Sequence, residues 1–248
     1  MRIRAISLGA TLLGLAGAGE LQGQRFGRGM YFEPNIGYDG RFTFARIQYT
    51  VYGRSGWEFD YPTMERNLMT MISEVTALHP HVLASNIFRF DDPELLKYPV
   101  AYLSEPGYWI PSESEAQGLR TYLAKGGFLI VDDFRLNEWN NFQTQILRAL
   151  PGARIKRLDI SHPIFDTFFR ISTLDMHYPT PGYDWIKAEF YGIYEENDPA
   201  RRLIVMINYN NDIGDYMEWS GTPGWWPVNT TNEAYKLAIN YIIYGLTR

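Results

Sequence analysis

The chain has 248 residues, of which 46% are apolar, enough for one large domain or two small ones. Its net charge is −5, which argues against both a disordered polyelectrolyte and a basic nucleic-acid-binding protein. It contains no cysteine, which excludes disulfides, a cysteine nucleophile, thiolate zinc sites and iron–sulfur clusters. An aromatic content of 16%, with 7 Trp and 18 Tyr, is the unusual feature that a function has to explain.

The first segment has the features of a secretory signal peptide. Arg2 and Arg4 precede the uncharged run Ala5–Ala18, which ends in a small-x-small pattern. The run is shorter than the roughly 20 residues that cross a bilayer as a helix. We therefore expect cleavage after Ala18 and a periplasmic or secreted protein without a membrane span. Because residues 1–18 contain two arginines and no acid, the mature net charge would be −7.

Residues 19–40 are rich in Gly, Arg and Asn and show no periodicity, which predicts a flexible N-terminal tether or a loosely docked arm. Residues 41–248 contain no internal repeat and no obvious linker. We expect them to form a single domain.

The first half of this domain alternates between strand-like and helix-like patterns. Phe42–Tyr49 predicts a strand, and a helix can begin at Pro62. Apolar residues then recur with a period of 3.6 along one helix face: Met64, Leu68, Met71, Ile72, Val75 and Leu78. Val82–Phe90 and Pro99–Leu103 are short strand-like runs.

The second half continues the alternation. A capping box of Ser112 and Glu115 begins a helix that ends at Gly126-Gly127, and the apolar run Phe128–Val131 is typical of a strand buried on both faces. The remaining predicted elements are a helix near 139–150, strands over 185–194 and 203–209, a loop over 210–230 and a final helix. This order predicts an α/β fold, an open and mostly parallel sheet with helices on both faces.

Ligands of such sheets gather at the carboxyl ends of the strands. The residues that follow the strand-like runs there, and so are candidates for binding, are Arg46, Trp57, Asp60, Tyr61, Asp132, Asp133, Asp212, Asp215, Glu218 and Trp219. A carboxylate in this place can bond a sugar hydroxyl, coordinate a hard cation or act as a general base. Alternatively, Asp132 or Asp133 simply caps the following segment.

His162 lies in an irregular stretch, where it is either an acid–base group or a residue that hydrogen-bonds its loop to the domain. The histidines lack the spacing of a metal site, so we expect no metal, although Asp132, Asp133 and His162 together leave one arrangement open. Nucleotide-binding and serine-hydrolase motifs are missing from the sequence, and we expect no cofactor.

The predicted loop Asn210–Thr230 concentrates aromatic residues among Gly, Pro and Asn, including Trp219, Trp225 and Trp226. Such side chains are suited to stacking on sugar rings or to binding a protein partner. The alternative is a lid of aromatic side chains packed over the end of the sheet.

Several short motifs resemble those of one bacterial family, domain of unknown function 4159. They are Phe44–Tyr49, Asp60-Tyr61-Pro62, Gly126–Asp133, His162–Phe165, Gly214-Asp215 and Glu218-Trp219. The resemblance implies a flavodoxin-like sheet of the class I glutamine-amidotransferase type, distantly similar to trehalose-utilisation proteins. True amidotransferases use a cysteine nucleophile, so the absence of cysteine rules out glutamine hydrolysis by that route.

The sequence leaves a structural subunit as a third possibility beside two more specific functions. One is a non-catalytic module of the cell envelope that binds a glycan or a protein through the aromatic loop and the acidic strand ends. The other is a cofactor-free hydrolase, lyase or isomerase acting on a carbohydrate. In that case Asp132 or Asp133 is the base, His162 the acid, and Arg46 holds an anion.

Overall fold

The computed structural model describes residues 32–52, 56–180 and 182–248. The chain divides into residues 1–33 and a compact unit of residues 34–248, which contains all the helices and strands given below. The expected signal peptide, residues 1–18, and residues 19–31 of the expected tether lie outside the described residues. Within the described ranges, no helix combines the length and apolar character needed to cross a bilayer.

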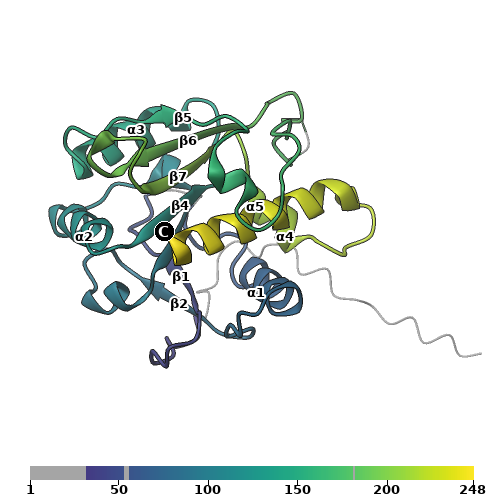
Figure 1. Cartoon of the computed structure of the whole chain (residues 1–248), viewed down its shortest axis with the longest axis horizontal. Coiled ribbons are helices and arrows are strands. Elements are labelled where there is room, and N and C mark those ends of the chain that lie inside the picture. The colour runs from purple at the N-terminus through teal and green to yellow at the C-terminus, as the bar shows by residue number, and fades with distance from the viewer. Residues whose placement is uncertain (1–31, 53–55, 181) are drawn as a thin grey trace, which may run out of the picture. The chain divides into compact units, whose positions relative to one another are not determined.

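The centre of the domain is a seven-stranded sheet of order β2-β1-β3-β4-β7-β6-β5 (Figure 1). Five adjacent strands are parallel: β2 (Ser85–Phe88), β1 (Phe44–Ile47), β3 (Val100–Ser104), β4 (Phe128–Asp132) and β7 (Leu203–Tyr209). Two further strands, β6 (Glu189–Tyr194) and β5 (Lys156–Arg157), extend the sheet in antiparallel fashion. The predicted open, mostly parallel sheet is confirmed, and the five parallel strands follow the doubly wound order 2-1-3-4-5.

Helices cover both faces of the sheet (Figure 1). One face carries α1 (Thr63–Val75), α4 (Ile213–Glu218) and α5 (Val228–Thr247), which pack against one another. The other face carries α2 (Glu113–Ala124) and α3 (Glu138–Ala149). Short 3₁₀ turns connect the elements: η1 (Pro93–Lys97), η2 (Pro106–Tyr108), η3 (Pro163–Asp166) and η4 (Glu195–Asn197).

The alternation of side chains along each strand divides the core between these two faces. Phe44, Tyr102, Ile130 and Met206 pack with the buried side chains of α1, α4 and α5. The intervening residues point to α2 and α3. All five residues of β4 are buried, as expected for a central strand covered on both sides.

Two short elements were absent from the predicted order. Helix α4 lies inside the segment expected to be a loop, and its N-cap is Asp212, whose side chain accepts a hydrogen bond from the backbone N–H of Asp215 at 2.8 Å. A helix of six residues is too short to show an apolar period. Strand β5 has two residues, both basic, and likewise leaves no pattern.

The last part of the expected tether is docked on the sheet. Asn35 exchanges two hydrogen bonds of 2.8 Å with the backbone of Ile87 in β2. The backbone of Ile36 does the same with the amide side chain of Asn86, at 2.9 and 3.0 Å. Residues from 34 onward therefore belong to the compact unit.

Helix α2 approaches the segment after β2 so closely that it requires a glycine. A Cβ at position 118 would lie 2.1 Å from the carbonyl oxygen of Phe90. We expect Gly118→Ala to lower the free energy of unfolding by roughly 1–3 kcal/mol, measured by urea denaturation. Gly37→Ala, where no atom lies within 4 Å of the new Cβ, is the matched control and should cause no loss. Equal stabilities for the two variants would contradict this packing.

Candidate functional site

Four neighbouring strands each place one buried polar side chain on the face covered by α1, α4 and α5. These residues are Arg46 of β1, Tyr102 of β3, Asp132 of β4 and Asn208 of β7. Each occupies the face on which the preceding core residues of its strand lie, near the carboxyl end of the strand. The apolar core thus ends in a polar row at the edge where ligands of parallel sheets bind.

Asp132 connects this row. Its Oδ2 accepts hydrogen bonds from the Tyr102 hydroxyl at 2.8 Å and from the backbone N–H of Gly214 at 3.1 Å. Its Oδ1 accepts one from the side-chain amide of Asn208 at 3.0 Å. Burial raises the pKa of Asp132 to about 7, and these donors partly oppose the shift. With both oxygens engaged, Asp132 holds α4 against the end of the sheet.

Arg46 fixes the segment that leads to α1. Its Nε donates to Glu65 Oε1 at 2.5 Å, and its Nη1 donates to the carbonyl oxygens of Trp57 and Phe59 at 2.7 and 2.9 Å. The guanidinium also lies 5.2 Å from the centre of the Tyr102 ring. Trp57, an expected binding residue, is buried, whereas Tyr61 is half-buried beside Arg46.

Five carboxyl groups gather next to the polar row and are called the carboxylate cluster: Asp60, Asp133, Asp212, Asp215 and Glu218. They form two groups of three that share Asp60, and in each group one oxygen per residue lies within 4.8 Å of the others. The group of Asp60, Asp133 and Asp212 is buried. In the second group, Asp215 and Glu218 of α4 are half-buried, so the cluster reaches the surface on the side of α4.

Burial raises the pKa of every carboxyl in the cluster, and repulsion from neighbouring carboxyls adds to the effect at Asp60, Asp212 and Asp215. The pKa values of Asp60 and Asp212 lie well above the usual range, and that of Asp215 is about 7. The Tyr178 hydroxyl donates to Asp133 Oδ1 at 2.9 Å, which partly opposes the shift at Asp133. At neutral pH the cluster therefore retains protons.

The backbone around the cluster repeatedly takes the left-handed conformation. The φ angles are 65° at Asp60, 51° at Glu105, 61° at Asp133 and 55° at Asn210. Residues with a Cβ adopt this conformation rarely, and Asp and Asn tolerate it best. Three of these residues follow the ends of β3, β4 and β7 in the sequence. Of the four side chains, those of Asp60 and Asp133 belong to the cluster, whereas Asn210 accepts a hydrogen bond from the Leu136 backbone at 2.9 Å. Backbone in this conformation is common at functional sites.

Aromatic residues flank the half-buried side of the cluster. Trp219, which follows Glu218, stacks on Trp225 with ring centres 4.1 Å apart and an interplanar angle of 11°. Trp226 packs against Tyr216 of α4 at 5.5 Å and against the core. Trp225 remains 42% exposed. The segment therefore combines a packed part, Trp226, with an accessible part, Trp225.

His162 is not brought to this site. Its ring lies 6.2 Å from that of Tyr244, which contacts Phe128, the first residue of β4, whereas Asp132 is the last. Along a strand, four residue steps place Phe128 and Asp132 about 13 Å apart. His162 Nδ1 accepts a hydrogen bond from the Ile164 backbone and caps η3, so its expected partnership with Asp132 or Asp133 has no geometric basis.

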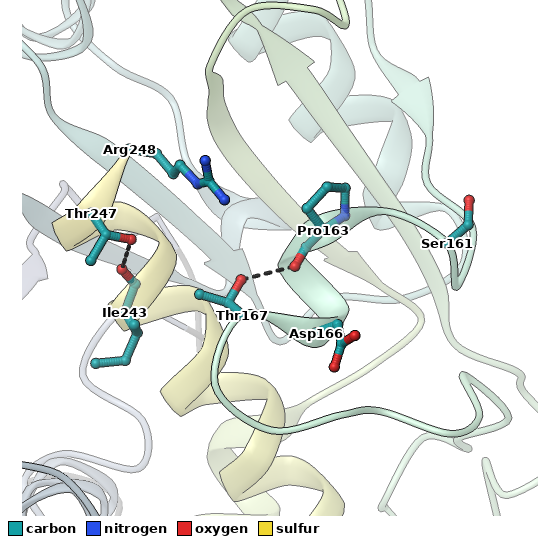
Figure 2. Close-up of a pocket in the computed structure, with 7 residues that line it drawn as sticks. All are labelled: Ser161, Pro163, Asp166, Thr167, Ile243, Thr247 and Arg248. Carbon is teal, nitrogen blue, oxygen red and sulfur yellow. Dashed lines mark hydrogen bonds between the residues drawn. The ribbon is translucent and has the colours of Figure 1, made fainter.

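An open hollow of about 570 Å³ lies near His162 and is lined by η3 and the end of α5 (Figure 2). The hydroxyls of Thr167 and Thr247 in its wall each bond a backbone carbonyl, of Pro163 and Ile243 respectively. The charged side chains of Asp166 and Arg248 also line this hollow. It holds one carboxyl group, whereas the carboxylate cluster brings five together, and we therefore take the cluster as the candidate site.

Tyr102, Tyr178 and Glu65 were not anticipated as site residues. One signal could have found Tyr102: a polar group near the carboxyl end of a buried strand, on the face of its core residues, which recurs at Arg46, Asp132 and Asn208. Tyr178 lies in an irregular segment and Glu65 on a helix, and neither carries a local pattern that points to the sheet edge.

The raised pKa values give the folded protein a particular pH dependence. A carboxyl with a pKa of about 7 in the folded chain and 3.8 when unfolded favours folding at low pH, and this contribution is lost as pH rises through 7. We expect the melting temperature in metal-free buffer to fall between pH 5 and pH 8, and the fall to be smaller in Asp215→Asn. Exposed Asp175, paired with Lys187, supplies the control Asp175→Asn. An unchanged slope in Asp215→Asn would contradict the assignment.

The residues that form this site lie in a segment that matches a known sequence family. None of the curated proteins compared with the chain matches it. Residues 43–246, which include every strand and the whole carboxylate cluster, match the family described as "Domain of unknown function (DUF4159)". This match spans most of the 248 residues, and the chain therefore belongs to the DUF4159 family.

Proposed function

We propose that this domain is a binding module that holds a polyhydroxylated ligand of the glycan class at the carboxylate cluster. One observation supports the proposal above the others. Asp215 and Glu218 lie on α4 directly before Trp219, which lowers the pKa of both carboxyls and whose ring stacks on partly exposed Trp225. Carboxyl groups that can accept hydrogen bonds from hydroxyls, and an exposed aromatic ring, thus lie on one short segment of the chain.

The chemistry of a sugar fits this combination. Its hydroxyls donate hydrogen bonds to carboxylates, and the C–H face of its ring packs on an aromatic plane. Asp215 and Glu218 are half-buried and accessible from the side of α4, and one face of Trp225 is covered by Trp219, which leaves the other for a ligand. A protein partner could bind the same surface mainly through its aromatic side chains, so the carboxyl groups favour a sugar.

The relation to class I glutamine amidotransferases, and the more distant one to trehalose-utilisation proteins, is part of this proposal. On such a sheet the ligand binds at the carboxyl ends of the strands. The sequence contains no cysteine, so the amidotransferase nucleophile has no counterpart among its 248 residues. Binding without that chemistry is the simplest function consistent with this loss.

A carbohydrate-active enzyme is the second candidate, and Asp215 favours it. A half-buried carboxyl with a pKa of about 7, in one group with Asp60 and Glu218, is suited to general acid–base catalysis. In this form of the hypothesis His162 takes no part, and Asp132 holds the site together rather than acting as the base.

The glycan proposal predicts that Trp225→Ala weakens binding about tenfold, or ~1.4 kcal/mol, because one stacking surface is lost. Wild-type protein and variant would be compared by isothermal titration calorimetry with soluble cell-wall and storage oligosaccharides. Trp185→Ala, another tryptophan that is 65% exposed, is the control and should bind as the wild type does. Oligosaccharides that are cleaved to shorter products by the wild-type protein, but not by Asp215→Asn, would favour the enzyme. Absence of binding to every oligosaccharide would overturn both carbohydrate functions and favour a protein partner.

We further propose that the protein is exported to the cell envelope, on the pattern of residues 1–18. Mass spectrometry of the protein from an envelope fraction should find a mature chain that begins at Gly19. A chain that retains Met1 and stays in the cytoplasm would contradict export.

A further inference from the structure

The carboxylate cluster has the composition of a metal site as well as of a sugar-binding edge. We infer that Asp60, Asp215 and Glu218 bind one hard divalent cation, with the carboxyl groups of Asp133 and Asp212 next to it. This inference goes beyond the glycan proposal and does not depend on it.

The spacing of the oxygens suits a single ion. One oxygen from each of Asp60, Asp215 and Glu218 lies within 4.8 Å of the other two. Oxygen ligands surround Ca²⁺ at about 2.3–2.6 Å and Mg²⁺ at about 2.0–2.1 Å, so two ligands of one ion lie no more than about 5 Å apart. Three such oxygens can therefore contact one cation with small movements of their side chains.

Unsatisfied buried atoms point to a missing ligand independently of the clustering. Asp60 is only 5% exposed, and its Oδ2 has no hydrogen-bond partner. The Oε2 atom of Glu218 is also buried without a partner. A buried carboxylate oxygen left in this state is costly, and a cation is the ligand that satisfies two of them together.

Gly214 shows where the free oxygen of Asp60 lies. A Cβ at position 214 would be 2.6 Å from Asp60 Oδ2 and 3.3 Å from Asp212 Oδ1. The two carboxyl groups thus meet over the one residue of α4 that has no side chain. Glycine is needed here for this approach, and the approach places Asp60 Oδ2 among the other carboxyl groups rather than toward solvent.

The charges nearby leave the cluster uncompensated. Arg46 is close enough to lower the pKa of Asp60 and of Glu218, but its Nε is bonded to Glu65 at 2.5 Å. Arg135 likewise lowers the pKa of Asp133. Two guanidinium groups, one of them shared with Glu65, face five carboxyl groups. All the donors are carboxylate oxygens, which favour Ca²⁺, Mg²⁺ or Mn²⁺ over softer metals.

The test uses the full chain, freed of metal with a chelator, and titrates it at pH 8 with CaCl₂, MgCl₂ and MnCl₂ by calorimetry. We expect one cation per chain and a melting temperature that rises with cation concentration. Asp60→Asn and Glu218→Gln should each weaken binding at least tenfold. Asp175→Asn, an exposed carboxyl outside the cluster, should bind as the wild type does.

Folding of the variants is read from their melting temperatures in chelator. Asp60→Asn removes a repelling buried charge and should melt no lower than the wild type at pH 8. If it fails to fold, the half-buried Glu218→Gln decides the question alone. Wild-type protein that binds none of the three cations at millimolar concentration would overturn the inference, as would unchanged affinity in Glu218→Gln. No glycan is present, so this result is distinct from the outcome of the sugar titrations.

Discussion

The buried guanidinium of Arg46 is the constraint around which this end of the molecule is arranged. A charge without solvent exposure has to be matched by partners, and Arg46 obtains them from three separate places: Glu65 of α1 and the carbonyl oxygens of Trp57 and Phe59. These bonds fix residues 57–59, which lie just before α1. Asp60 follows directly after them, so its carboxyl is carried into a region that a negative charge would otherwise avoid.

A second anchor, Asp132, acts from the middle of the sheet. It joins β3, β7 and the backbone of α4 through three hydrogen bonds, and thereby positions the helix that carries Asp215 and Glu218. The site is thus divided into an inner layer that supports and an outer layer that faces solvent. The inner layer is tied to several elements by its hydrogen bonds, whereas the outer layer contains Asp60 and Glu218, each with a carboxyl oxygen that has no partner.

Sequence patterns were sufficient wherever one periodicity extends over many residues. The apolar run of β4, the helical period of α1 and the capping box of α2 all led to elements that the structure contains. The expected edge of the sheet was also correct for Asp60, Asp133, Asp215 and Glu218, because strand ends in a parallel sheet converge. His162 was misplaced, since nothing local shows which end of the sheet an irregular segment approaches. Helix α4 was missed because six residues are too few for a period.

The docking of residues 35 and 36 on β2 has a consequence for how the molecule meets copies of itself. The amide side chain of Asn35 occupies the backbone N–H and C=O of Ile87, which the outermost strand β2 would otherwise offer to another chain, and the Asn86 side chain holds Ile36 beside them. At the opposite margin, β5 is only two residues long and consists of Lys156 and Arg157, whose like charges repel a second copy. Both edge strands of the sheet are thus protected from pairing with a strand of another copy. We therefore do not expect the protein to polymerise edge to edge at high concentration.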